Sequence, residues 1–291
     1  MLHKYSQLKT IISNSKLSVT IDHKGAELIS LQRIDMPKDY MWEGNPDYWG
    51  KHSPILFPIV GTLKNNSYTY NDKTYSLSRH GFARDMVFEL VSQTDNEVVF
   101  SLQSSDVTQE IYPFDFELQI IYTLKDLSLR IGYKVSNKGS EDMYYAIGGH
   151  PALALPNDFY GYSLQFESNE RLLSYELEND LLSDTAKTIH LIDTKLPLTY
   201  SLFEKDALIF KEMQSKQIQL LENGVPFLNF RFEGFPNFGI WTKRNAPFIC
   251  LEPWVGYSDV VNALGNIKDK EGIQKLNPKT SKDYTFSLEI L

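Results

Sequence analysis

Strict alternation of apolar and polar residues is the feature that most constrains how this chain can fold. From Phe116 to Leu124 every second side chain is apolar, and the same pattern runs from Leu127 to Val135. The last residues, from Tyr284 to Ile290, repeat it once more. A period of two puts the apolar side chains on one face of a β-strand, so these segments predict half-buried strands joined by short turns.

Shorter alternating runs complete the pattern, and helical patterns are scarce. Residues 87–91, 98–102 and 143–147 also alternate. Ser105–Tyr112 predicts one short helix, ended by Pro113, and Val260–Leu264 predicts another. Because no long stripe of period 3.6 exists, βαβ units are not expected. We predict an all-β fold, a large antiparallel β-sandwich, and, since no linker divides residues 1–291, a single domain.

Composition narrows the class of protein. The net charge is −8 with no basic run, which argues against nucleic acid as a partner. The single cysteine, Cys250, permits no intrachain disulfide. The start of the chain, Met1 to Ser15, has no continuous apolar region typical of a secretion signal, and no stretch is long enough to span a membrane. We expect a cytoplasmic protein, a monomer or homodimer, that makes no contact with a membrane.

Four segments interrupt the alternation with glycine or proline next to ionisable or aromatic residues. In sheet proteins such strand ends and loops are where sites are usually built. The segments are Trp49–Gly61, Arg79–Asp85, Gly148–Ala152 and Leu251–Asp259.

Two residues in these segments are candidates for acid–base chemistry. His150 lies between Gly149 and Pro151, which hold the chain rigidly and allow a close approach. Glu252 follows a buried apolar run, where burial would raise its pKa toward the range useful for proton transfer. Each has a simpler interpretation, a strand-end histidine bonded to a carbonyl and a glutamate paired with Arg or Lys. Taken singly, the simpler interpretation is favoured for each.

Other residues are candidates for substrate binding. His80 can donate to a hydroxyl, and Arg79 or Arg84 can bind sugar oxygens or a phosphate, although an Arg84–Asp85 ion pair is an equally ordinary use. Trp254 can form the floor of a sugar cleft, as can Trp49 and Trp241, although core packing is the more frequent role of a tryptophan. The histidines lack the close spacing of metal ligands, so no metal site is expected.

Together, the four segments resemble those of the aldose 1-epimerase (galactose mutarotase-like) family, most closely its LacX-type branch. The likeness runs from about Asn14 to Leu291 and rests on WGKHSPILFPIVG, RHGFARD, GGHPA and LEPWVGYSD in that order. It implies a galactose mutarotase-like supersandwich, no cofactor, and interconversion of the α and β anomers of an aldose.

The resemblance also implies a role for each matching residue. His150 would be the acid that protonates the ring oxygen, and Glu252 the base that takes the proton of the C1 hydroxyl. His80 matches a sugar-binding histidine and Asp206 a substrate-binding aspartate. Lys51 stands where an arginine is expected, and a lysine offers a point charge in place of a planar fork. The partner would be a small sugar or a sugar phosphate.

Two alternatives remain beside an aldose 1-epimerase. A non-catalytic carbohydrate-binding protein would keep the aromatic floor and His80 but would not need His150 and Glu252 together. A glycoside hydrolase usually needs two carboxylates, and only one well-placed carboxylate is recognised here. For the enzyme, we expect the two side chains to face each other across one cleft that holds a pyranose.

Overall fold

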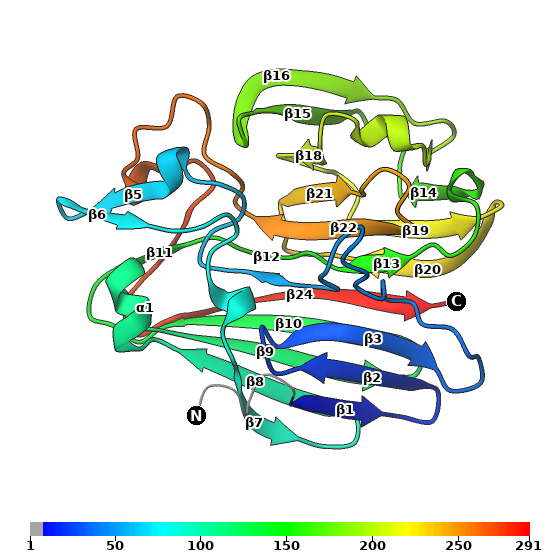
Figure 1. Ribbon diagram of the computed structural model, residues 1–291, viewed down its shortest axis with the longest axis horizontal. Coiled ribbons are helices and arrows are strands. Elements are labelled where there is room, and N and C mark those ends of the chain that lie inside the picture. Colours follow the sequence, from blue (N-terminus) through cyan, green and yellow to red (C-terminus); the bar gives the residue numbers. More distant parts are fainter. Residues whose placement is uncertain (1–7) are drawn as a thin grey trace.

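The largest element of the protein is a twisted antiparallel sheet of nine strands. The computed structural model describes residues 8–291 (Figure 1). In spatial order the nine strands are β17 (Lys195–Pro197), β14 (Tyr162–Phe166), β19 (Gln217–Glu222), β20 (Val225–Arg231), β24 (Ser281–Ile290), β10 (Ser128–Asn137), β9 (Phe116–Lys125), β8 (Glu97–Gln103) and β7 (Glu89–Gln93). The strands predicted from the strongest alternation, β9, β10 and β24, are neighbours at its centre.

A second, eight-stranded sheet lies against the first. Its strands are, in order, β16 (Leu181–Ile189), β15 (Leu172–Glu178), β18 (Leu208–Phe210), β21 (Asn237–Trp241), β22 (Phe248–Val255), β12 (Ile147–Gly149) and β4 (Ile55–Leu56), with β13 (Ala152–Ala154) also paired to β22. Neighbouring strands of this sheet pair antiparallel throughout. In Figure 1 the β15–β16 hairpin is at the top of the view.

Smaller sheets and short helices complete the chain. The sheets are β1 (Lys9–Ser13) with β2 (Leu17–Asp22) and β3 (Glu27–Arg33), β5 (Ser67–Tyr70) with β6 (Lys73–Ser76), and β11 (Met143–Tyr145) with β23 (Gln274–Leu276). The 3₁₀ turns are Lys64–Asn66, Ala83–Asp85, Phe159–Gly161, Tyr200–Phe203 and Ile267–Asp269.

The helix predictions are half right. The helix predicted before Pro113 is confirmed as α1 (Asp106–Ile111), which starts at a capping box formed by Ser105 and Thr108. The helix predicted at Val260–Leu264 is wrong. Val260 instead bridges to Leu182 of β16, which holds this segment extended at its start. Among residues 8–291 no helix is long and apolar enough to cross a membrane.

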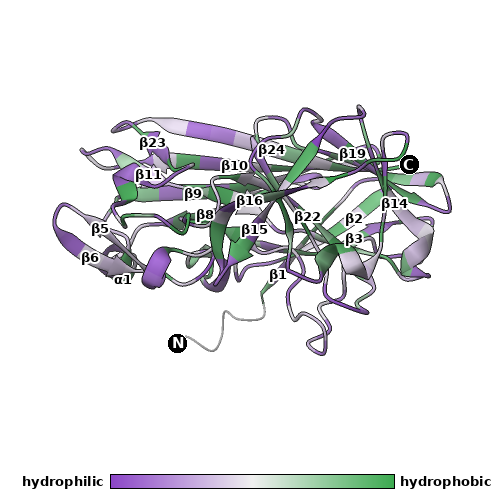
Figure 2. Cartoon of the chain, turned by 90° about the horizontal axis from the view of Figure 1, so that it is seen from above, coloured by the Kyte–Doolittle hydropathy of each residue, from purple (hydrophilic) through white to green (hydrophobic). Residues whose placement is uncertain are grey.

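The core lies between the two large sheets, and strand β22 shows how it is organised. Every residue of β22 is buried. Its odd-numbered side chains Ile249, Leu251 and Val255 belong to the main core shared with β9, β10 and β24. The even-numbered ones lie on the opposite face of the strand. In Figure 2 the hydrophobic colour follows the strands, and the outer loops are largely hydrophilic. The eight-stranded sheet therefore has one face in the core and another free to build a site.

Candidate functional site

A cavity of about 600 Å³ lies on the outer side of the eight-stranded sheet. Such a volume is within the range of sites for small molecules. Glu252 and Trp254 line it from β22, and Ile209 lines it from β18, two strands away in the sheet. Loops and the β15–β16 hairpin form its walls. The remaining lining residues are Trp49, Gly61, Arg79, His80, Arg84, His150, Leu177, Phe203, Lys205, Asp206, Ala207, Trp241, Thr242, Lys243, Arg244 and Ser258.

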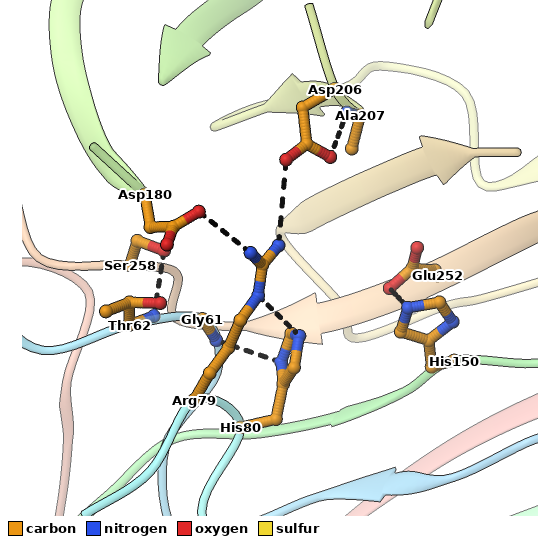
Figure 3. A network of polar contacts seen from close by, with 10 residues as sticks. All are labelled: Gly61, Thr62, Arg79, His80, His150, Asp180, Asp206, Ala207, Glu252 and Ser258. Carbon is orange, nitrogen blue, oxygen red and sulfur yellow. Dashed lines mark hydrogen bonds and ion pairs between the residues drawn. The ribbon is translucent and has the colours of Figure 1, made fainter. Parts of the chain in front are cut away.

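Strand register brings His150 and Glu252 together. Gly148 pairs with Trp254 on one side, and Ala152 pairs with Cys250 on the other. Counting inward from either pair puts His150 directly opposite Glu252, because both strands have three residues between the pairs. Side chains at opposite positions of antiparallel strands are nearest neighbours. His150 Nε2 accordingly lies 3.3 Å from Glu252 Oε2 (Figure 3).

This placement differs from the expected one in an informative way. The two groups do not face each other across the cleft. They stand side by side on one wall of it. The simpler interpretation of Glu252, a pair with Arg or Lys, is not what the structure has among the described residues, because the ionisable group in contact with its carboxyl is the imidazole of His150.

Burial controls the charges of this pair. Glu252 is 1% exposed and His150 is 9% exposed. Burial raises the pKa of Glu252 well above its ordinary 4.5, against the opposing effect of Arg79. Burial lowers the pKa of His150 to about 3, and the positive charges of Arg79 and Arg84 act in the same direction. Both directions favour an uncharged pair that holds one proton, on the carboxyl group.

The floor of the cavity is the indole ring of Trp254. An added Cβ on Gly148 would be 2.6 Å from this ring, and one on Gly239 would also be 2.6 Å from it. Glycines on the two strands that flank β22 therefore make room for the ring to lie flat across the sheet. Trp49 stacks on His150 with ring centroids 4.7 Å apart, and Trp241 contacts the same imidazole edge-on at 5.8 Å.

His80 enters the cavity from a tight turn. Its φ is 67°, in the left-handed region, and the next residue, Gly81, packs so closely on Phe57 that a Cβ would lie 2.3 Å from the Phe57 carbonyl oxygen. The backbone N–H of Gly61 donates to His80 Nδ1 at 3.1 Å. Burial lowers the pKa of His80 well below 6.5. Arg79 Nε–H points at the other ring nitrogen, Nε2, at 3.3 Å, so each nitrogen of His80 faces an N–H group, an arrangement that disfavours a second proton on the ring and agrees with a neutral imidazole.

Arg79 joins two acidic residues at the rim of the cavity. Its Nη1 donates to Asp180 Oδ1 at 3.0 Å, and its Nη2 lies 3.9 Å from Asp206 Oδ2 (Figure 3). Asp180 is at the tip of the β15–β16 hairpin. Asp206 adopts φ of 112°, an unusual value for a residue other than glycine, and its Oδ1 accepts from the Ala207 N–H at 2.7 Å.

The structure brings most of the predicted site residues together. His150, Glu252, His80, Arg79, Asp206 and Trp254 all line one cavity. Lys51 does not line it. The Lys51 ammonium group lies 3.5 Å from Asp85, which also lies 3.7 Å from Arg84. The role proposed for Lys51 in orienting a sugar therefore has no support in the geometry.

Sequence reasoning missed several residues of this cavity. Lys205 and Ser258 line it from loops, and Asp180, at a hairpin tip, contacts the lining residue Arg79. The Asn179–Asp180 pair had a readable turn pattern, since both residues tolerate positive φ. Its contact with Arg79, about a hundred residues away in the chain, had no sequence signal.

Cys250 completes a cluster that spacing along the chain did not reveal. It is two residues before Glu252, on the same face of β22. One ligand-type atom from each of His150, Cys250 and Glu252 lies within 4.8 Å of the other two. All three residues are buried.

The two-sheet antiparallel sandwich is the fold of solved galactose mutarotase-like proteins. The family model for aldose 1-epimerase matches residues 7–268, so the chain belongs to that family. The chain is 33% identical to the plasmid-encoded protein LacX of Lactococcus lactis subsp. lactis, over 96% of this chain and 98% of that one.

Two solved structures are similar over their whole length. One is a galactose mutarotase related enzyme from Lactobacillus acidophilus, with a TM-score of 0.93 and 32% identity, covering 98% of this chain and 97% of that chain. The other is a galactose mutarotase-like protein from Lactobacillus casei, with a TM-score of 0.91 and 29% identity, covering 98% and 100%. These likenesses confirm the predicted fold class and family.

Proposed function

We propose that the protein is an aldose 1-epimerase that interconverts the α and β anomers of an aldohexose, with His150 and Glu252 as its acid–base pair. The observation that carries the proposal is the 3.3 Å contact of the two groups inside the cavity. The ring oxygen and the C1 hydroxyl of a pyranose are bonded to the same carbon. An acid and a base that act on them at once must therefore stand side by side, as His150 and Glu252 do.

The reaction needs one proton on the pair. Transfer of that proton from Glu252 to His150 across the contact gives an imidazolium and a carboxylate. The carboxylate then takes the C1 hydroxyl proton, the oxygen electrons form the C1 carbonyl, and the C1–ring oxygen bond breaks. The ring oxygen takes the imidazolium proton. Rotation about C1–C2 and the reverse steps close the ring with the other anomer and restore the charges.

The surrounding residues have distinct roles in the proposal. Trp254 supports the apolar face of the sugar, and the imidazole of His80 contacts a hydroxyl. Arg79 and Asp206 bind hydroxyls at the rim. Trp49 holds the His150 ring in place by stacking on it.

The charges of the cavity favour an unphosphorylated sugar. Arg79 is engaged with Asp180, and Lys205 makes two contacts with Glu176 at 2.9 and 3.0 Å. Lys243 donates to the backbone carbonyls of Asp47 and Tyr48. A phosphate would have to compete with these partners for its cations. We therefore expect free aldohexoses to be better substrates than their 6-phosphates.

The first prediction tests the acid–base pair. His150→Asn and Glu252→Gln should each lower kcat by about 10²–10⁴-fold, which is the usual contribution of a positioned acid or base. Polarimetry on freshly dissolved α-glucose, α-galactose and their 6-phosphates measures the rate. Matched controls are His190→Asn and Glu89→Gln, which are exposed and outside the cavity.

Two results would contradict the proposal. If the unmodified protein binds sugars but never exceeds their spontaneous rate of anomer exchange, it is a carbohydrate-binding protein. If both pair variants keep full activity and a native circular dichroism spectrum, catalysis is located elsewhere.

A further inference from the structure

The strand that carries Glu252 also presents the protein's single cysteine to the same pair. Cys250 has no exposed surface. Its sulfur, a ring nitrogen of His150 and a carboxylate oxygen of Glu252 all lie within 4.8 Å of one another. The mutarotase reaction proposed above has no use for this thiol. Imidazole nitrogen, thiolate sulfur and carboxylate oxygen are the ligand types that zinc prefers in proteins.

The spacing of two of the three ligands already suits a metal ion. His150 Nε2 and Glu252 Oε2 are 3.3 Å apart. Two ligands about 2.0–2.1 Å from a tetrahedral zinc ion are separated by about 3.3 Å. The Cys250 sulfur lies within 4.8 Å of the other two ligand atoms and has to move closer to them to bind the same ion. Rotation of the short Cys250 side chain can supply that movement.

A second observation points to a ligand at this place. Glu252 Oε2 is buried, and its 3.3 Å contact with His150 Nε2 lacks the geometry of a hydrogen bond, so among the described residues the oxygen has no hydrogen-bond partner. A buried polar atom without a partner is costly, and a cation would satisfy it. His150 and Glu252 line the cavity, so a fourth ligand position is open to water or solute. His150 Nδ1 also has no hydrogen-bond partner among the described residues. Histidines that bind a metal ion normally donate from their second ring nitrogen to such a partner. We therefore expect the ion to bind reversibly and not as a permanent structural part.

We propose that His150, Cys250 and Glu252 form a binding site for a thiophilic divalent cation such as Zn²⁺, and that the bound ion inhibits the enzyme. The ion takes Nε2 and the carboxylate, so neither can exchange protons with a sugar. The thiol proton and the proton of the acid–base pair are released to solvent when the ion binds. The inhibitory part rests on the function proposed above, whereas the site itself does not.

Binding is tested without reference to activity. The metal-free protein is titrated with Zn²⁺ against a chromophoric chelator and, separately, with Co²⁺ while its spectrum is recorded. We expect one equivalent of Zn²⁺ to bind and Co²⁺ to give a thiolate charge-transfer band with tetrahedral visible bands. Cys250→Ala should abolish the charge-transfer band and weaken Zn²⁺ binding by at least about 100-fold, since losing only an outer partner of a ligand costs about 10–100-fold.

Activity then separates the two proposals. Cys250 does not line the cavity, so Cys250→Ala should keep its mutarotase rate and should no longer be inhibited by Zn²⁺. In the unmodified protein, a chelator should restore the activity that Zn²⁺ has removed. The site is overturned if the unmodified protein shows no cobalt–thiolate band, or if Cys250→Ala binds Zn²⁺ as tightly as the unmodified protein. If the band appears but no sugar is turned over, the site stands and the enzymatic proposal fails.

Discussion

At the scale of single residues, the site depends on where side chains are absent as much as on where they are present. Because Gly148 and Gly239 have no side chains, the ring of Trp254 can lie flat over them. A residue of any other type at either position would push the indole upward into the cavity. The floor of the site is therefore set by two strand glycines that make no contact with a sugar.

The second prediction follows from this packing. Gly239→Ala would place a Cβ 2.6 Å from ring atoms of Trp254, a contact that neither side can absorb without shifting. We expect a loss of about 1–3 kcal/mol in the free energy of unfolding, as for other overpacked positions, and a higher KM because the floor is displaced. Urea unfolding and sugar kinetics measure the two effects.

Gly132→Ala is the matched control. This glycine also lies inside a strand, but its added Cβ would be 3.6 Å from Ile121, an ordinary contact. Equal effects of the two substitutions on KM would mean that the position of Trp254 does not matter for binding.

The same scale shows what the sequence can and cannot reveal. The roles of His150 and Glu252 were inferred by resemblance, and period two alone puts Cys250 and Glu252 on one face of a strand. That His150 stands opposite Glu252 depends on the register of two strands about a hundred residues apart, which no local pattern specifies. For the same reason the alternation predicted β9, β10 and β24 to within a few residues but not their order in the sheet.

At the scale of elements, the β15–β16 hairpin is one edge of the eight-stranded sheet and contributes Leu177 to the cavity wall. Its tip residue Asp180 holds Arg79 at 3.0 Å, and Leu182 just beyond the tip exchanges backbone hydrogen bonds with Asp259 and Val261. The hairpin is thus fixed on the segment that follows Glu252. The geometry of Arg79 at the rim depends on this hairpin.

The third prediction concerns that contact. Asp180→Asn removes the charge that orients Arg79, so we expect KM to rise several-fold while kcat stays nearly unchanged. Both partners are about half exposed, and exposed pairs contribute only about 0–1 kcal/mol, so the unfolding midpoint should hardly move. Asp184→Asn, on an exposed position of the same hairpin, is the control. A fall in kcat with unchanged KM would show instead that Asp180 affects the chemistry.

At the scale of the whole molecule, buried ionisable groups link folding to pH. In the unfolded chain both His80 and His150 have their ordinary pKa of 6.5, and Glu252 has 4.5. In the folded protein burial lowers the pKa of both imidazoles and raises that of the carboxyl. Between pH 4.5 and 6.5 the unfolded chain therefore binds two protons at these groups, and the folded protein binds one, on the His150–Glu252 pair.

The final prediction is the pH dependence of stability that results. Because the unfolded state binds one more proton in this window, stability falls as the pH falls, by up to about 1.4 kcal/mol per pH unit from these three groups. The His150–Glu252 pair contributes nothing to that slope, since its proton is present in both states, and the extra proton belongs to His80. Wherever the pH is above 6.5 but below the raised pKa of Glu252, the folded pair keeps a proton that the unfolded chain has lost, so stability falls again as the pH rises through this range. His80→Gln should therefore flatten the acid side, and Glu252→Gln should flatten the alkaline side and steepen the acid side, because the folded variant then holds none of the two protons that the unfolded chain binds. Urea unfolding of chelator-treated protein from pH 4.5 to 9 gives the difference curves. An unchanged acid slope in His80→Gln would mean that His80 is charged in the folded protein, and its assignment as a neutral imidazole would then be wrong.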